Sequence, residues 1–163
     1  MLEVTQIDGE WAVVIEYVEG RTLEQLMQEN PEKMEEYMEK FVDLQLSMHE
    51  KKAPRLTLQK DKFARKIESV KDKLDATVRY ELLTRLDFMP NHTKLCHGDF
   101  NPSNVIVAED GTMKIVDWAP ATQGNASSDA VITYLEFALK DQKNSFSAGQ
   151  ISLISSKFYR KTI

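Results

Sequence analysis

The first twenty residues alternate apolar and polar positions in short runs. The runs Val4–Ile7 and Trp11–Tyr17 are rich in β-branched and aromatic residues, and Asp8-Gly9 between them is typical of a two-residue hairpin turn. The chain is therefore predicted to start with a β-hairpin, which ends at Gly20.

Helical spacing follows Gly20. Thr22 and Gln25 form a capping box for a short helix over Leu23–Glu29, and Asn30-Pro31 supplies a cap and a first-turn proline for a second helix. In that second helix, apolar side chains recur every three or four positions, which predicts a face buried in the core. They are Met34, Met38, Phe41, Leu44 and Met48.

Another helical region follows the break at Ala53-Pro54. Apolar residues at helical spacing predict one amphipathic helix that extends to Leu74, and a further helix is expected over about 77–86. Lysines and carboxylates are interleaved on the outer face of the first helix, which indicates a solvated surface and not a basic patch. The apolar residues of that helix are Phe63, Ile67, Val70 and Leu74.

Strand-like runs return after Pro90. Val105–Val107 and Met113–Val116 flank Glu109-Asp110-Gly111, which predicts a tight hairpin. Such a hairpin would bring Asn104 and Asp117, at its outer ends, close enough to share an ion. A helix capped by Ser127 or Ser128 should follow, and a last helix is expected over Ile151–Tyr159. The predicted apolar side of the helix after Ser128 is Val131, Ile132, Leu135 and Leu139.

Composition narrows the class of protein. With 163 residues, 42% of them hydrophobic, the chain can bury one core, and its net charge of −5 argues against a nucleic-acid partner. The single cysteine, Cys96, excludes an internal disulfide and is interpreted as a small buried hydrophobe. No run approaches the roughly 18 apolar residues of a membrane span, so no membrane partner and a cytoplasmic location are expected.

The strongest candidates for catalytic residues lie in the segment from His97 to Asn104 and at Asp117, thirteen residues after Asn104. Phosphoryl transfer needs an Asp that accepts a hydroxyl proton and oxygen ligands that hold Mg²⁺ on the phosphates. Asp99, Asn104 and Asp117 are of those kinds and follow the order found in protein kinases. Asp129 follows only twelve positions after Asp117, which leaves no room for a phosphorylated activation loop, so a protein kinase proper is not expected.

Two plainer interpretations stay open for these residues. Asp99 and Asn104 could be turn residues with local hydrogen bonds, and Asp117 could simply end a strand. A zinc site built from His92, His97 and Asp99 is disfavoured, because the spacing gives no helical ligand pair and no set of thiolates supports it.

With these motifs in view, the chain resembles the aminoglycoside phosphotransferase family from about Val4 to about Leu139. The resemblance rests on Leu95–Val107 and Ile115–Trp118, and more softly on Trp11–Gly20. It implies an α+β fold, mainly the α-helical C-terminal lobe of the protein-kinase-like fold, with an N-terminal β-hairpin and a catalytic-loop β-hairpin. Residues 1–20 would be a hinge hairpin remaining from the small lobe, and residues 21–163 the helical lobe, with a catalytic loop at 97–104 and a metal-binding segment at 115–119.

The family resemblance also implies a function. Members use ATP and Mg²⁺ to phosphorylate a hydroxyl of a small molecule such as an aminoglycoside, choline or a related metabolite, and the insert between Pro54 and Asn91 looks like the region that binds the acceptor. The roles carried over are Asp99 as catalytic base; Asn104 and Asp117 as Mg²⁺ ligands; Glu16, Tyr17 and Val18 as backbone contacts to adenine; Ile106 as the floor of that pocket; and His97, Gly98 and Asp129 as structural support.

The sequence lacks other kinase features. No strand lysine and no phosphate-covering G-x-G-x-x-G loop precede the hinge, so we expect most of the N-terminal lobe to be missing from this chain. The alternative to an active kinase is a non-catalytic remnant or a nucleotide-binding module of the same fold. Expected partners are a small-molecule hydroxyl acceptor, and either a second copy of the chain or a complementing N-terminal lobe.

Overall fold

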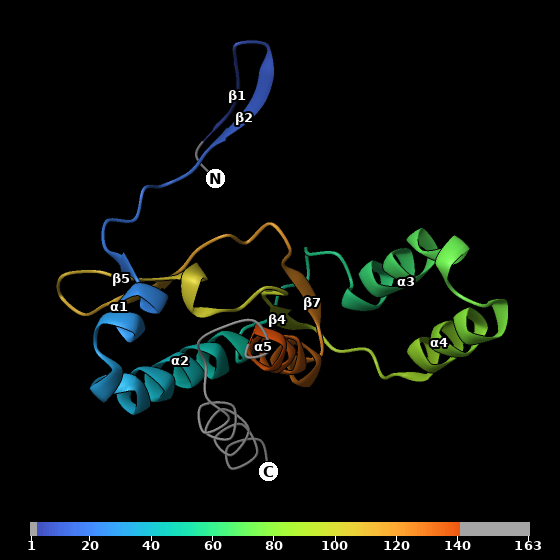
Figure 1. Ribbon diagram of the computed structural model, residues 1–163. Helices are drawn as coiled ribbons and strands as arrows, with labels where there is room; N and C mark the ends of the chain where they lie inside the picture. The colour runs from blue at the N-terminus through green and yellow to red at the C-terminus, as the bar shows by residue number, and fades with distance from the viewer. Residues whose placement is uncertain (1–2, 141–163) are drawn as a thin grey trace.

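The computed structural model describes residues 3–140 (Figure 1). Helices and strands are mixed, which is compatible with the predicted α+β class, and the helix expected over Ile151–Tyr159 lies outside the described residues. The elements are β1 (Glu3–Ile7), β2 (Glu10–Val14), β3 (Arg21–Thr22), α1 (Leu23–Glu29), η1 (Pro31–Lys33), α2 (Met34–His49), α3 (Gln59–Ser69), η2 (Lys71–Lys73), α4 (Ala76–Phe88), β4 (Lys94–Cys96), η3 (Pro102–Asn104), β5 (Val105–Val107), β6 (Met113–Ile115), β7 (Thr122–Gly124) and α5 (Ala126–Lys140), the η elements being 3₁₀ helices.

The predicted N-terminal hairpin is confirmed and extends away from the helices (Figure 1). Asp8 and Gly9 both have positive φ, 52° and 84°, as a type I′ turn requires. The prediction that the second strand reaches Tyr17 is wrong, because β2 ends at Val14, where it pairs with Glu3. Within the described residues, β1 has no residue that pairs with Ile15, so the strand pairing ends at Val14.

The capping box at the start of α1 is confirmed. Thr22 Oγ1 accepts from Gln25 N at 3.1 Å, and Gln25 Oε1 accepts from Thr22 N at 3.1 Å. Asn30 does not cap the next helix as predicted. Its Nδ2 instead donates to Leu26 O at 3.0 Å and closes the C-terminal end of α1, while Pro31 opens the 3₁₀ turn that precedes α2.

The apolar stripe of α2 forms the core, as its spacing predicted. Phe41 stacks on Phe100 of the loop after β4, with ring centroids 4.4 Å apart, and meets Phe137 of α5 edge-on at 6.0 Å. This packing fixes the loop that carries Asp99 against two helices. The buried core residues are Leu23, Met27, Met38, Phe41, Phe100, Val105 and Phe137.

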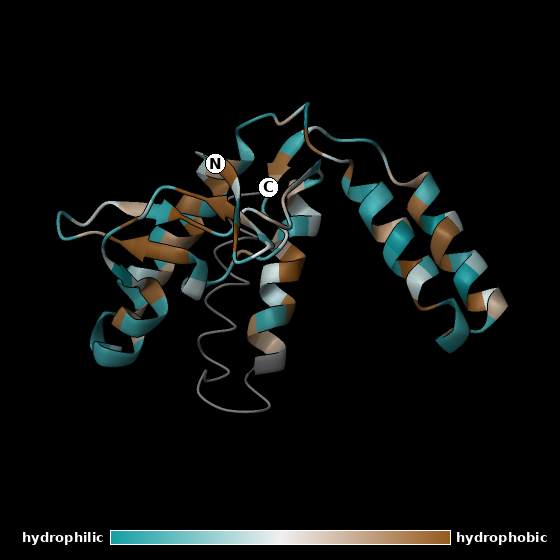
Figure 2. Cartoon of the chain, turned by 90° about the horizontal axis from the view of Figure 1, so that it is seen from above, coloured by the Kyte–Doolittle hydropathy of each residue, from teal (hydrophilic) through white to brown (hydrophobic). Residues whose placement is uncertain are grey.

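Helices α3 and α4 form a helical hairpin that projects from the side of the molecule (Figure 1). Hydrophilic residues are spread over both helices, in agreement with the predicted solvated face (Figure 2). The single helix predicted through Leu74 is wrong, since α3 ends at Ser69 and Leu74 is extended. This extended stretch lets Asp75 cap α4, its Oδ1 accepting from Thr77 N at 2.8 Å.

Three antiparallel strands and one strand pair hold the loops of the molecule in place. The sheet order is β3-β5-β6, and β4 pairs with β7. The predicted hairpin over β5 and β6 is confirmed, with Val105 opposite Ile115.

Helix α5 presents a different face to the core from the one predicted. Val131 is 53% exposed and Leu135 47% exposed, Ile132 is half-buried, and Asp129, Thr133 and Phe137 are buried, while the side chain of Leu139 lies outside the described residues. The predicted serine caps are also wrong, because α5 begins at Ala126 and Asn125 Oδ1 accepts from Ser127 N at 2.9 Å. The buried face carries Phe137 of the core, and Asp129 and Thr133 can share that face because their polar groups are hydrogen-bonded.

No helix within residues 3–140 has the length and apolar character needed to cross a bilayer.

Candidate active site

The loop that carries Asp99 lies between β4 and η3. Asn101 caps η3, its Oδ1 accepting from Ser103 N at 3.0 Å, and Pro102 occupies the first helical position. This single 3₁₀ turn places Asn104 back beside Asp99, five residues earlier.

The carboxylate of Asp99 is held by two amides. Asn104 Nδ2 donates at 2.9 Å both to Asp99 Oδ2 and to Asp99 O, and Asn101 Nδ2 donates to Asp99 Oδ1 at 3.1 Å. Each carboxylate oxygen therefore accepts one bond and keeps a further lone pair for a substrate proton. Because the amide nitrogen of Asn104 is turned to Asp99, its Oδ1 is the atom left to serve as a ligand.

Asp117 lies beside Asn104 at the end of the β5–β6 hairpin. Val116 N donates to Asn104 O at 3.0 Å, so the residue before Asp117 is bonded directly to Asn104. Asp117 is exposed and has φ +59°, a left-handed conformation that is uncommon for residues other than glycine. Strained backbone of this kind concentrates at functional sites.

His97 links the two halves of the site. Its ring is fully buried, Nε2 donates to Val116 O at 3.0 Å, and the ring lies 4.9 Å from that of Trp118. Since Nε2 carries the proton, Nδ1 is the acceptor, and it has no hydrogen-bond partner within the described part of the chain. The histidine thus fixes the backbone just before Asp117, and nothing in this geometry presents it to a substrate.

Gly98 is where the chain passes closest to the segment after Asp117. It has φ +81°, and a Cβ atom there would lie 2.9 Å from Pro120 O. A side chain is excluded on both counts, by backbone conformation and by space.

Asp129 of α5 holds the loop that carries Asp99 in place through hydrogen bonds. Its Oδ1 accepts from Gly98 N at 2.7 Å, and its Oδ2 accepts from His97 N at 3.2 Å and from His49 Nε2 at 2.9 Å. Burial opposes ionisation of Asp129, but these hydrogen bonds outweigh it and hold the pKa of the carboxyl below its ordinary value. Asp129 thus bonds the amides of the two residues directly before Asp99.

Sequence reasoning missed two polar residues of this buried network. Gln45 Nε2 donates to Thr133 Oγ1 at 3.0 Å, and Thr133 Oγ1 donates to Phe100 O at 2.9 Å. The available signal was the pairing of Gln45 with His49 and of Asp129 with Thr133, each four residues apart on a helix. Polar pairs at that spacing inside an otherwise apolar segment indicate a buried hydrogen-bond network.

The residues predicted to meet adenine lie near β5 and β6. Glu16 Oε1 is 3.7 Å from Lys114 Nζ, and Lys114 is paired with Ile106 across the hairpin. Gly20 approaches the same strand closely, since a Cβ there would lie 2.8 Å from Ile106 Cγ2. The structure therefore brings Glu16 and Ile106 to one region. Val18 is half-buried, whereas the Tyr17 side chain is 86% exposed.

The structure supports neither a zinc site nor a reactive cysteine among the described residues. His92 is exposed, His97 is buried, and no group of three or more His, Cys, Asp or Glu side chains suited to a metal occurs among residues 3–140. Burial raises the pKa of the Cys96 thiol to about 12, so this cysteine is the small buried hydrophobe that the sequence predicted and not a nucleophile.

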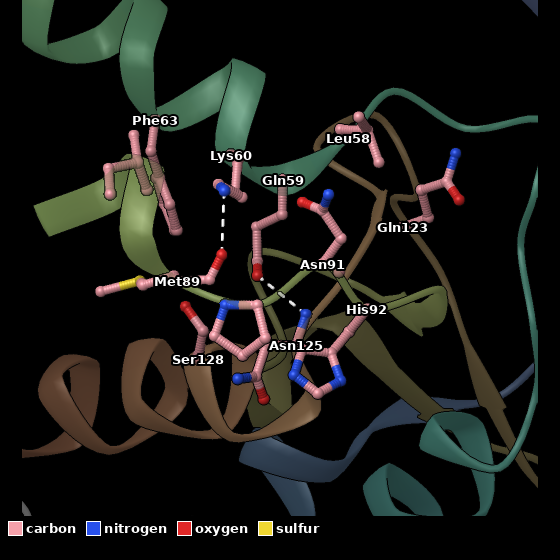
Figure 3. Close-up of a pocket in the computed structure, with 13 residues that line it drawn as sticks. Leu58, Gln59, Lys60, Phe63, Met89, Asn91, His92, Gln123, Asn125 and Ser128 are labelled. Atoms are coloured by element: carbon pink, nitrogen blue, oxygen red, sulfur yellow. Dashed lines mark hydrogen bonds between the residues drawn. The ribbon is translucent and has the colours of Figure 1, made fainter. Parts of the chain in front are cut away.

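A small pocket lies where the α3–α4 hairpin meets β7 and the start of α5 (Figure 3). Leu58, Phe63, Leu86 and Met89 form its apolar wall, and Asn91, His92 and Ser128 contribute polar groups. Asp99, Asn104 and Asp117 do not line it. The pocket is thus the junction between the helical hairpin and the body, separate from the Asp99 loop.

The donor set fits a magnesium ion that also binds phosphate. Mg²⁺ prefers oxygen ligands and is commonly held by one or two protein oxygens together with water and substrate phosphates. Asn104 Oδ1 and the exposed carboxylate of Asp117 are such oxygens, and the hydrogen bond between Val116 and Asn104 keeps the two residues adjacent.

Comparison with known proteins gives a consistent result. The model of the phosphotransferase enzyme family matches residues 4–151, a range that contains most of the N-terminal hairpin, the Asp99 loop, Asp117 and Asp129. None of the curated proteins matches this chain. Since the family match covers most of the 163 residues, the chain belongs to the phosphotransferase enzyme family.

Proposed function

We propose that this protein is an ATP- and Mg²⁺-dependent kinase that phosphorylates a hydroxyl of a small molecule, on the helical lobe of a protein-kinase-like fold. The observation that carries the proposal is the juxtaposition of Asp99, Asn104 and Asp117. Asn104 bonds the Asp99 carboxylate at 2.9 Å and is itself bonded through its carbonyl to Val116, next to Asp117.

In this proposal Asp99 is the catalytic base. The acceptor hydroxyl donates its proton to a carboxylate oxygen of Asp99 as its own oxygen forms a bond to the terminal phosphorus of ATP, and the bond to the bridging oxygen breaks to release ADP. Asn101 and Asn104 hold both carboxylate oxygens in place, so the base is oriented before the acceptor arrives.

Asn104 and Asp117 would hold the magnesium ion. When bound there, the ion would neutralise the negative charge that develops on the phosphate during transfer. The protein contributes the fixed spacing between the two ligands, through the β5–β6 hairpin and the left-handed backbone at Asp117.

The remaining roles follow the positions of the elements. Adenine would lie against the backbone of residues 16–18 and over Ile106, a placement supported by the closeness of Glu16 to Lys114 and of Gly20 to β5. The acceptor would approach Asp99 from the side of the α3–α4 hairpin. Its identity is a matter for a substrate panel, because a fold supports a reaction class far better than a substrate.

The test is ATP consumption by the full chain with aminoglycosides, choline and amino alcohols as acceptors. Asp99→Asn keeps the size of the side chain but cannot take a proton, so turnover should fall by about 10² to 10⁴, the usual contribution of a general base. Asp72→Asn, on an exposed 3₁₀ turn, is the matched control and should leave turnover unchanged. Equal turnover by wild type and Asp99→Asn would refute the assignment of the base.

Nucleotide binding separates this proposal from its alternative. Calorimetry with Mg-ATP on wild type and on Asp117→Asn tests whether the metal side of the site works without an acceptor. Binding that Asp117→Asn weakens supports the metal assignment, and such binding without turnover on any acceptor would identify a nucleotide-binding module instead of a kinase.

A further inference from the structure

Lys62 is the residue through which the α3–α4 hairpin reaches the candidate active site. It lies in the first turn of α3, and its Nζ donates to Pro120 O at 2.6 Å. Pro120 is the third residue after Asp117. One turn of a peripheral helix is thus bonded to the segment that carries a proposed metal ligand.

The same ammonium lies against the loop that carries Asp99. A Cβ atom on Gly98 would be 3.4 Å from Lys62 Nζ and 2.9 Å from Pro120 O, so three chain segments meet at this point. Burial, and then the nearby Lys66, outweigh the negative charges of Asp129 and Asp99 and hold the pKa of Lys62 below its ordinary value. Within residues 3–140 none of the ion pairs includes Lys62, so its fixed contact is the Pro120 carbonyl.

The contact matters because the backbone three residues before Pro120 has an unfavourable conformation. Asp117 has φ +59°, and a conformation of this kind persists only where the surroundings hold it. Ala121 N donates to Trp118 O at 3.0 Å, which closes a turn over the residues between Asp117 and the Lys62 contact. A bond to Pro120 therefore restrains the turn that follows Asp117.

We propose that Lys62 is a positioning residue that fastens the segment after Asp117 to the Asp99 loop and couples both to the α3–α4 hairpin. The expected effect of Lys62 on the rate rests on the proposed function, whereas its role in holding the two segments together does not. Since the hairpin borders the acceptor side in the proposed function, the same bond would transmit acceptor binding to the placement of Asp117.

The neighbouring Lys60 provides a matched control. It lies on the same helix, and its Nζ also donates to backbone carbonyls, those of Asp87 at 2.8 Å and Met89 at 2.9 Å. Both acceptors belong to the hairpin or its end, and Figure 3 shows the Lys60 side chain directed to Met89. Loss of Lys60 therefore loosens the hairpin without touching the segment after Asp117.

The experiment compares Lys62→Met, Lys62→Arg and Lys60→Met in the full chain. Methionine keeps most of the aliphatic stem and removes the charge and the donors. Hydrogen exchange followed by mass spectrometry should show at least tenfold faster exchange in peptides covering residues 117–121 for Lys62→Met, and wild-type exchange there for Lys60→Met. Unchanged exchange in Lys62→Met, or an equal increase in Lys60→Met, would overturn the proposal whether or not the protein turns over.

Kinetics on any acceptor found by the panel give the second measurement. A displacement of about 1 Å in a catalytic group can cost up to 10²-fold in rate, so kcat of Lys62→Met should fall about tenfold or more, with Lys62→Arg restoring most of it. Equal kcat for Lys62→Met and wild type would also overturn the proposal. Absence of turnover in the wild type would count against the proposed function alone, and hydrogen exchange would then decide the role of Lys62.

Discussion

Replacing Asp129 by Asn tests whether its buried carboxylate holds the Asp99 loop in place. Asp129 accepts from Gly98 N, His97 N and His49 Nε2, at 2.7, 3.2 and 2.9 Å. An asparagine has one acceptor oxygen, so in either orientation its NH₂ group faces at least one of these donors. The variant loses a charge-assisted hydrogen bond and leaves a buried donor unsatisfied, each worth about 1–3 kcal/mol.

The expected loss of unfolding free energy is therefore about 3 kcal/mol, to be measured by urea denaturation. With a slope of about 2 kcal/mol per molar urea, the midpoint should fall by about 1.5 M. Asp72→Asn, on the surface, should stay within about 0.5 kcal/mol of wild type. A loss below about 0.5 kcal/mol for Asp129→Asn would show that these hydrogen bonds do not stabilise the fold as argued.

Comparison of the same variant with wild type should also show how the contribution of Asp129 to the unfolding free energy depends on pH. The pKa of Asp129 is lowered in the folded protein, so its contribution to stability is complete above the unfolded-state carboxyl pKa of about 3.9 and is lost as the pH falls through the folded value. The difference in unfolding free energy between wild type and Asp129→Asn should thus narrow from about pH 7 to about pH 3. A constant difference over that range would contradict the pKa argument.

Two further substitutions test local structure. Thr22→Ala removes one half of the capping box of α1 and should lower the unfolding free energy by about 1 kcal/mol, measured by urea denaturation against an exposed Thr57→Ala control. Gly20→Ala should cost about 2–4 kcal/mol, because its Cβ would lie 2.4 Å from Val107 O at φ +147°. Gly111→Ala, with φ +82° and no atom within 4 Å of the added Cβ, should cost only about 1 kcal/mol, and equal losses at the two glycines would refute the steric argument.

Elements whose determinants lie within a few residues could be read from the sequence. The Asp8-Gly9 turn, the capping box at Thr22 and the β5–β6 hairpin all have the predicted form. Each depends on backbone conformation or on hydrogen bonds between close neighbours in the chain. The stripe of α2 was predictable for a related reason, since three or four residues separate the members of one helix face.

Helix α5 shows where such reasoning fails. Two of its apolar residues, Val131 and Leu135, are exposed, and the buried side carries Asp129 and Thr133 beside Phe137. Hydrophobicity alone could not indicate this, because the buried carboxylate is stabilised by donors from His49, His97 and Gly98, distant in the sequence. The family resemblance, and not the helical pattern, identified Asp129 as a supporting residue.

The sequence by itself determined the chemistry available at the candidate site, since the order of Asp99, Asn104 and Asp117 and the turn between the last two are local properties of the chain. Only the tertiary structure decided how these groups are held. It placed Lys62, which the sequence assigned to a solvated charged face, on Pro120 O, and it directed the Asp129 carboxylate to the amides before Asp99. Such contacts depend on which distant segments pack together, because a buried or half-buried polar group is stable only where the fold brings it a partner.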